Sequence, residues 1–237
     1  MRILITNDDG IGSPVLPALA VWASRLGEVT VIAPKVEQSG MSHAIDFTRP
    51  IEIKRVDIGE GIRAFSMDST PADCVRYAVM GMKEHFDLVI SGINRGLNLG
   101  ADIVYSGTIG AIFEASRLGI KGVAISTDPH SFDAAMARIG DVWDFFEQEK
   151  LLELGNIYNV NIPLDDKGIR VTRQGGIYFT DDFKYLGNDM YEQIGAMADP
   201  KSDDERFDNV AVIHGYISIT PLTSEKTNLE VYKRFEK

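Results

Sequence analysis

Two adjacent carboxylates at the end of the first expected strand constrain this chain more than any other feature. Residues 2–6 (Arg-Ile-Leu-Ile-Thr) are short and apolar, which indicates a buried strand, and the turn 7–10 (Asn-Asp-Asp-Gly) follows directly. Open α/β sheets bind ligands at the carboxyl ends of their strands. Because close carboxylates repel each other and hard divalent ions prefer oxygen ligands, Asp8 and Asp9 indicate a site for Mg²⁺ or Mn²⁺. The alternative is an Asx-turn with solvated acids.

Composition bounds the class of protein. The 237 residues are 44% hydrophobic and 25% charged, as expected of one sizeable globular domain. A net charge of −11 argues against binding to nucleic acid polymers or anionic membranes, but not against a small phosphorylated substrate beside a metal. One cysteine, Cys74, excludes an intrachain disulfide. Because the chain opens on a strand pattern and holds no apolar run of about 18 residues, we expect no leader peptide and a cytoplasmic protein.

The hydrophobic pattern predicts alternating strands and helices. Helices are expected at 13–26, 70–82, 107–118 and 131–148, and strands at 2–6, 29–33, 86–90, 121–126 and 156–162. A hairpin is expected from segments 51–56 and 62–65, and further strands at 169–173 and 210–219. Ser13 and Thr70 are predicted N-caps, and Asp73 is a first-turn acid of its helix more than a catalytic one. This alternation predicts an α/β fold with a doubly wound, mostly parallel sheet.

The C-terminal part departs from this pattern. We predict one domain over residues 1–237, with a core of about 1–165 and 210–222. Residues 175–209 are polar, acidic and aromatic, and they are too many for an ordinary loop. They are predicted to form a β-rich excursion, an arm or hairpin used in oligomerisation. Its Phe and Tyr side chains in 178–191 are expected to pack in the core or at an interface, and stacking on a base is the alternative if the arm folds back. The tail 224–237 is predicted to form a short terminal helix.

Two further loops carry oxygen-rich side chains. Residues 38–42 (Gln-Ser-Gly-Met-Ser) follow the second strand, where the Ser39 hydroxyl can bind a metal or a phosphate and Gly40 permits close approach; an ordinary turn is the alternative. Residues 91–100 (Ser-Gly-Ile-Asn-Arg-Gly-Leu-Asn-Leu-Gly) are predicted to form a long glycine-rich turn. Asparagines in it supply neutral oxygen ligands and amide donors. This segment matches neither nucleotide-binding glycine motif.

A fourth loop opens the expected helix 107–118. Residues 105–111 (Tyr-Ser-Gly-Thr-Ile-Gly-Ala) place hydroxyls beside the free N–H groups of a helix start, which is a natural anion site; simple capping by Ser106 is the alternative. Carboxylates for a metal and a helix N-terminus for an anion together indicate metal-assisted phosphoryl chemistry. His43, near the serine loop, is a candidate proton donor to the leaving group.

Taken together, these segments resemble the SurE (survival protein E) family of nucleotidases and acid phosphatases over nearly the whole chain. The matching segments are 5–10, 39–40, 70–75, 91–100, 105–111 and 218–222. The resemblance implies a Rossmann-like fold. It also implies a divalent-metal-dependent phosphomonoesterase that acts on nucleoside 5′-monophosphates and often on 3′-monophosphates.

The same resemblance implies the site residues. The ligands of the one divalent ion are then Asp8, Asp9, Ser39 and Asn94. The phosphate site is then lined by Asn98, Ser106, Gly107 and Thr108, with Asn7 and Gly40 assigned to it as well. Family members are dimers or tetramers that exchange their carboxyl-terminal extensions, although segment 178–209 departs most from the family pattern.

The expected mechanism is attack of water on phosphorus. Asp8 and Asp9 hold the metal, Asp9 is the base or orienting group, and the amides and hydroxyls of 106–108 stabilise the phosphoryl charge. A covalent aspartyl-phosphate intermediate stays open as a variant. Other enzyme alternatives are a broad-specificity acid phosphatase and an exopolyphosphatase. Non-enzymatic alternatives are a receiver domain, which the residues after the third core strand disfavour, and a metal- and nucleotide-binding sensor.

Overall fold

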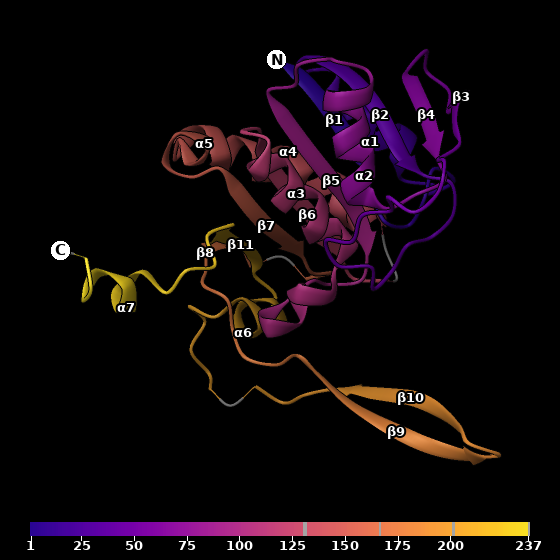
Figure 1. The fold of residues 1–237 in the computed structure, drawn as a ribbon. Coiled ribbons are helices and arrows are strands. Elements are labelled where there is room, and N and C mark those ends of the chain that lie inside the picture. Colours follow the sequence, from indigo (N-terminus) through magenta and orange to yellow (C-terminus); the bar gives the residue numbers. More distant parts are fainter. Residues whose placement is uncertain (130–131, 166, 201, 237) are drawn as a thin grey trace.

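A nine-stranded sheet forms the centre of the computed structural model, which describes residues 1–129, 132–165, 167–200 and 202–236 (Figure 1). Its strand order is β3-β4-β2-β1-β5-β6-β7-β11-β8, and all neighbours are parallel except β3 with β4 and β7 with β11. The strands are β1 (Arg2–Thr6), β2 (Glu28–Pro34), β3 (Ile53–Val56), β4 (Arg63–Met67), β5 (Leu88–Arg95), β6 (Lys121–Thr127), β7 (Ile157–Ile162), β8 (Ile169–Val171) and β11 (Ile217–Leu222). This order confirms the doubly wound α/β fold.

Helices cover both faces of the sheet (Figure 1). They are α1 (Leu16–Ala23), α2 (Pro71–Arg76), α3 (Gly107–Arg117), α4 (Phe132–Gln148), α5 (Leu151–Leu154), α6 (Asp208–Ile213) and α7 (Leu229–Lys233). A π-helical turn (Tyr77–Gly81) extends α2, and a 3₁₀ helix (Gly100–Tyr105) precedes α3. Alternate residues of β1 point to opposite faces: Ile3 and Ile5 join the core under α1 and α4, and Leu4 joins the core under α2 and α3. Both faces of the sheet are therefore buried against apolar side chains, as is usual for a parallel sheet.

Several predicted elements are confirmed with shifted ends. Thr70 caps α2, because its Oγ1 accepts a hydrogen bond from the amide of Asp73. The first helix is shorter than predicted, and Ser13 does not cap it; the helix starts after Val15 with no side-chain cap. Helix α4 is described from Phe132, and the predicted start at Ser131 lies outside the described residues, as does Lys237 of the tail.

Two predictions about secondary structure are wrong, one of a strand and one of a turn. Residues 210–219 are not one strand, because 208–213 form α6 and only the residues from Ile217 onward pair with β7. A short apolar run does not distinguish a buried helix from a strand, and a turn at Gly215 (φ +86°) separates the two elements. The segment 91–100 is not one long turn, because β5 continues to Arg95. Gly92 makes this continuation possible, since a Cβ there would lie 2.3 Å from the carbonyl oxygen of Ile125 on β6.

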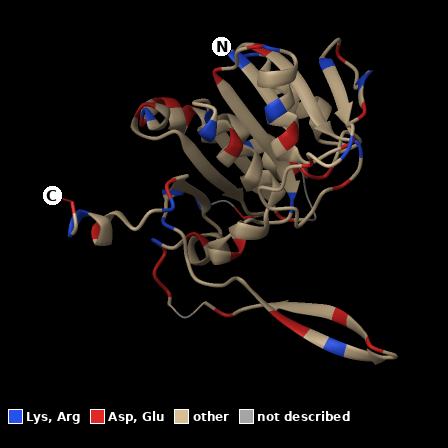
Figure 2. Ribbon diagram, viewed as in Figure 1, with Lys and Arg blue, Asp and Glu red and all other residues tan. Residues whose placement is uncertain are grey.

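The predicted excursion is a β-hairpin, which we call the arm. It consists of β9 (Phe179–Gly187) paired antiparallel with β10 (Met190–Met197), and it extends away from the sheet (Figure 1). Every residue of its strands except Gly187 is exposed. Four acidic residues and one lysine lie on it, whereas acidic and basic residues are interspersed over the body (Figure 2). Within the described residues, no helix is long and apolar enough to cross a membrane.

Candidate functional site

Asp8 and Asp9 lie directly beyond the carboxyl end of β1, between β2 and β5. The chain leaves β1 toward one side of the sheet and later returns to build the other side, so this position is the switch point of the topology. Doubly wound sheets open a crevice there, and ligands bind in it.

Thr108 holds Asp8 at the first turn of α3. Its hydroxyl donates to Asp8 Oδ1 at 2.6 Å and its amide donates to Asp8 Oδ2 at 3.1 Å. Asp8 is only 3% exposed. The approach favours glycine at 107, because a Cβ there would lie 3.1 Å from the Cβ of Asp8 and 3.2 Å from the carbonyl oxygen of Gln38, tighter than ordinary contacts. The carboxylate therefore faces the positive end of a helix.

Both carboxylates have raised pKa values. Burial is the main cause for Asp8, and the charge of Asp9 adds to it; together they raise the pKa of Asp8 to about 6 although Thr108 opposes the shift. Burial also raises the pKa of Asp9, and Glu37 contributes, while the amide of Arg95 donates to Asp9 Oδ2 at 3.1 Å and lowers it. The positive charge near Asp8 and Asp9 is therefore too small to offset their burial and mutual repulsion when both are ionised. A bound cation would supply it.

Of the other two predicted metal ligands, Ser39 lies on the loop after β2 and Asn94 lies near the end of β5. Ser39 Oγ donates to Glu37 Oε1 at 2.6 Å. Asn94 Nδ2 donates to the carbonyl oxygen of Gly96 at 2.7 Å, so the carbonyl oxygen of its side chain is the atom it offers to a cation. Among the described residues, no cluster of three or more His, Cys, Asp and Glu side chains suits a metal. A cation here would bind two carboxylates and neutral oxygens, a donor set typical of hard divalent ions.

Some of the predicted phosphate-site residues line a cavity, and others are buried and only support it. Ser106 and Asn98 line a cavity beside Asp8, as does Gly40. Asn7 does not line it: its buried side chain donates to the carbonyl oxygen of Gly10 and accepts from the amide of Gly10, which shapes the turn. Thr108 is also fully buried, and both of its donors serve Asp8.

Asn98 belongs to an asparagine cluster that sequence analysis missed. Its backbone amide donates to Asn161 Oδ1, and its carbonyl oxygen accepts from Nδ2 of both Asn159 and Asn161, each at 2.8 Å. Its side chain donates to Ser126 Oγ at 2.8 Å. The available signal was the pair of asparagines on either side of Val160 in an otherwise apolar strand. This cluster fixes the glycine-rich segment against β6 and β7.

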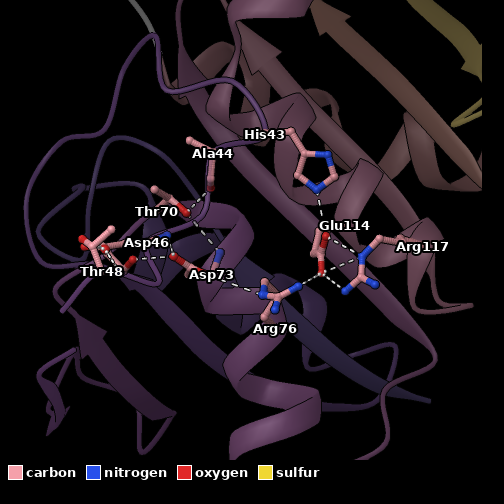
Figure 3. A network of polar contacts seen from close by, with 10 residues as sticks. His43, Ala44, Asp46, Thr48, Thr70, Asp73, Arg76, Glu114 and Arg117 are labelled. Atoms are coloured by element: carbon pink, nitrogen blue, oxygen red, sulfur yellow. Dashed lines mark hydrogen bonds and ion pairs between the residues drawn. The ribbon is translucent and has the colours of Figure 1, made fainter. Parts of the chain in front are cut away.

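A polar network fixes the loop that carries Ser39 and Gly40 (Figure 3). His43 Nε2 lies 2.8 Å from Oε2 of Glu114, a buried carboxylate of α3 that also pairs with Arg76 and Arg117. His43 therefore faces Glu114, and it is not among the residues that line the cavity; its role as proton donor stays a prediction. Burial raises the pKa of Glu114, but the hydrogen bonds and charges of His43 and Arg117 outweigh it and hold that pKa at about 2.

The same loop is attached at further points. Thr70 Oγ1 donates to the carbonyl oxygen of Ala44, and the amide of Asp46 donates to Asp73 Oδ2 at 2.7 Å (Figure 3). Gly110 of α3 lies directly under the loop, since a Cβ there would be 2.1 Å from the carbonyl oxygen of Ser42. The loop is thus rigidly seated on α2 and α3 although it has no regular secondary structure.

The cavity has a volume of about 860 Å³, which is within the range of small-molecule sites. One end is polar, with Asp8, Ser39, Asn94 and Ser106 among its residues. Tyr178, Phe179 and Met197, at the root of the arm where it joins the body, also line the cavity, as do Asp181 and Gln193 farther along its strands. The sequence favours core or interface packing of the Phe and Tyr side chains of 178–191 over stacking on a base, whereas in the structure Tyr178 and Phe179 line the cavity.

A doubly wound sheet with paired carboxylates and a helix N-terminus at its switch point defines a class of α/β proteins whose site suits a phosphorylated ligand. The family model described as Survival protein SurE matches residues 3–181. The chain belongs to the SurE family.

Individual relatives match over almost their full length. A protein of Thermosipho melanesiensis named 5′-nucleotidase SurE is 36% identical over 249 residues, covering 100% of this chain and 96% of the relative. One of Thermoanaerobacter sp. (strain X514) with the same name is 39% identical over 243 residues, covering 96% and 94%. The crystal structure of the SurE protein from Aquifex aeolicus superposes with a TM-score of 0.80 at 35% identity, covering 99% of this chain and 98% of that one.

Proposed function

We propose that this protein hydrolyses nucleoside 5′-monophosphates, and also 3′-monophosphates, to nucleoside and phosphate, with one bound Mg²⁺ or Mn²⁺. The observation that carries this proposal is the buried Asp8 carboxylate, which lies beside Asp9 and faces the first turn of α3. The site thus joins cation ligands to an anion-binding helix end. The relatives named 5′-nucleotidase SurE support the choice of substrate.

Four side chains are proposed to hold the cation: Asp8, Asp9, Ser39 and Asn94. When bound, such an ion neutralises the two carboxylates, polarises a phosphoryl oxygen and lowers the pKa of a coordinated water. Thr108 keeps Asp8 in one orientation through its two hydrogen bonds, so the ligand geometry is set before substrate arrives.

The remaining steps belong to the protein's own groups. Ser106 Oγ accepts from the amide of Ile109, which leaves its own proton to donate to a phosphoryl oxygen. The N-terminal end of α3 adds favourable electrostatics for the charge on the equatorial oxygens. Asp9, held at Oδ2 by the amide of Arg95, is proposed to orient the attacking water and accept its proton.

The proposal is tested by phosphate release from AMP and GMP. We expect release to stop with EDTA and to return when Mg²⁺ or Mn²⁺ is restored. The Asp8→Asn variant should remain folded by circular dichroism but show no metal-dependent release. Nucleotide binding without release under any metal would contradict an enzyme and favour a sensor.

We also propose that the chain, acting as one domain over residues 1–237, assembles into a dimer or tetramer through its arm and works in the cytoplasm. The arm supports this proposal, because isolated two-stranded hairpins are marginal in water and this one exposes large apolar side chains. These include Phe183 (64% exposed), Met190 (63%) and Tyr191 (60%). Light scattering should give a mass of two or four chains, and Tyr191→Asp should lower it. A wild-type monomer at micromolar concentration would refute the assembly.

A further inference from the structure

Aromatic and apolar side chains at the root of the arm line the cavity, together with Asp181 and Gln193 of its strands. Tyr178 directly precedes β9, Phe179 begins it, and Met197 ends β10. Hydrolysis of a phosphate ester needs none of these side chains. A cavity of about 860 Å³ also exceeds what a phosphate group fills, so the substrate has room for a second moiety at the apolar end.

The two rings form a supported surface. Tyr178 is only 5% exposed, packs in a cluster with Leu99 and Val212, and donates its hydroxyl to Met197 Sδ at 3.3 Å. Its ring meets that of Phe179 edge to face, with centroids 4.8 Å apart and planes at 76°. Phe179 remains 42% exposed and lines the cavity. The buried tyrosine therefore holds an accessible phenyl ring in place.

A single backbone segment connects this ring to the polar end. Asp102 Oδ2 accepts from the amide of Tyr178 at 2.7 Å and from that of Phe179 at 2.8 Å. Asp102 lies in the 3₁₀ helix that leads into Ser106, the cap of α3. At the start of that helix, Gly100 is pressed against the arm's root, since a Cβ there would lie 1.9 Å from the carbonyl oxygen of Gly176. The separation of the two ends of the cavity is therefore set by rigid contacts.

We infer that Phe179, supported by Tyr178, is a specificity-determining residue that stacks on the nucleobase of the substrate. The inference rests on the proposed function and deepens it, since it assigns the apolar end of the same cavity to the base. Aromatic side chains stack on any base through its π-face, so the ring confers preference for nucleotides over other phosphate esters without strong choice among bases. A sugar phosphate that lacks a base gains nothing from this ring.

The test compares AMP with ribose 5-phosphate, which has the sugar and the phosphate but no base. In Phe179→Ala we expect kcat/KM for AMP to fall roughly 5- to 150-fold, the range that corresponds to loss of one base–aromatic stack, with the change mainly in KM. Turnover of ribose 5-phosphate should stay at the wild-type value. Phe179→Trp should restore the AMP value.

The matched control is Phe183→Ala. Phe183 lies four residues along β9, is 64% exposed and does not line the cavity. We expect it to leave the ratio of the two substrates unchanged, and light scattering shows whether either variant alters assembly. Equal losses on both substrates in Phe179→Ala, or no loss on either, would overturn the stacking role.

The inference and the proposed function can fail separately. Wild-type protein that releases phosphate from AMP and ribose 5-phosphate with equal efficiency would refute base stacking and leave the phosphatase in place. Wild-type protein that releases none would refute the proposed function. In that case calorimetric binding of AMP to wild type and to Phe179→Ala decides the inference: equal affinity overturns it, and weaker binding by the variant supports it.

Discussion

Asp8 should make the metal-free protein less stable as the pH rises, and Asp8→Asn should lack this dependence. Burial, together with the charge of Asp9, raises the pKa of Asp8 from 3.8 to about 6 in the native state. The native carboxyl therefore holds its proton more tightly than the unfolded chain does. Stability associated with the neutral carboxyl is present at low pH and is lost as the pH rises through the native pKa.

The magnitude follows from the two pKa values. Each pH unit between them corresponds to about 1.36 kcal/mol, so the whole loss is about 3 kcal/mol. Between pH 5 and pH 7.5 the loss from Asp8 is about 1.4 kcal/mol. For a chain of this length that free energy corresponds to roughly 3–6 °C in the melting temperature.

The assay is unfolding in EDTA at both pH values, for wild type and for Asp8→Asn. Comparing the pH-induced changes removes any constant effect of the substitution, such as an imperfect hydrogen bond between the new amide and Thr108. Wild type should lose about 1.4 kcal/mol more than the variant, and Mg²⁺ added at pH 7.5 should stabilise only the wild type. Parallel pH dependences in the two proteins would refute the claim that this carboxyl is buried and raised.

Three further substitutions test helix α3: two in its first turn, beside Asp8, and one at Glu114, which anchors the loop of Ser39. Thr108→Val removes the 2.6 Å hydroxyl donor to Asp8, so kcat/KM should fall roughly 10- to 150-fold and the acidic limb of the pH–rate profile should move to higher pH. Gly107→Ala places a Cβ 3.1 Å from that of Asp8, so activity should fall at least about tenfold while circular dichroism shows an intact fold. Glu114→Gln removes the charge that pairs with Arg117 at 2.6 Å, and denaturant unfolding should show a loss of about 3 kcal/mol; unchanged stability would contradict its structural role.

Short stretches of sequence were enough to predict the class of fold and the paired acids of the candidate site. The short apolar strands, the turn after β1 and the cap at Thr70 are signals read from neighbouring residues, and they predicted the alternation that the structure shows. The paired acids after β1 predicted a site at the carboxyl edge of the sheet, because parallel strands place such ends together. The arm was foreseen as well, since its polar and aromatic composition cannot form a core.

Only the tertiary structure decided which of these residues share the cavity and what each one contacts. Thr108 meets Asp8 across 100 residues of sequence, and Asp102 holds the amides of Tyr178 and Phe179 across more than 70. Such contacts depend on how the strands are ordered in the sheet, which hydrophobic periodicity does not encode. The same holds for α6, where an apolar run fits a buried helix or a strand equally well until its neighbours are placed. The sequence by itself therefore determined the fold class and the chemistry of the candidate site residues. Packing decided which of these residues line the cavity and which hold the lining residues in place.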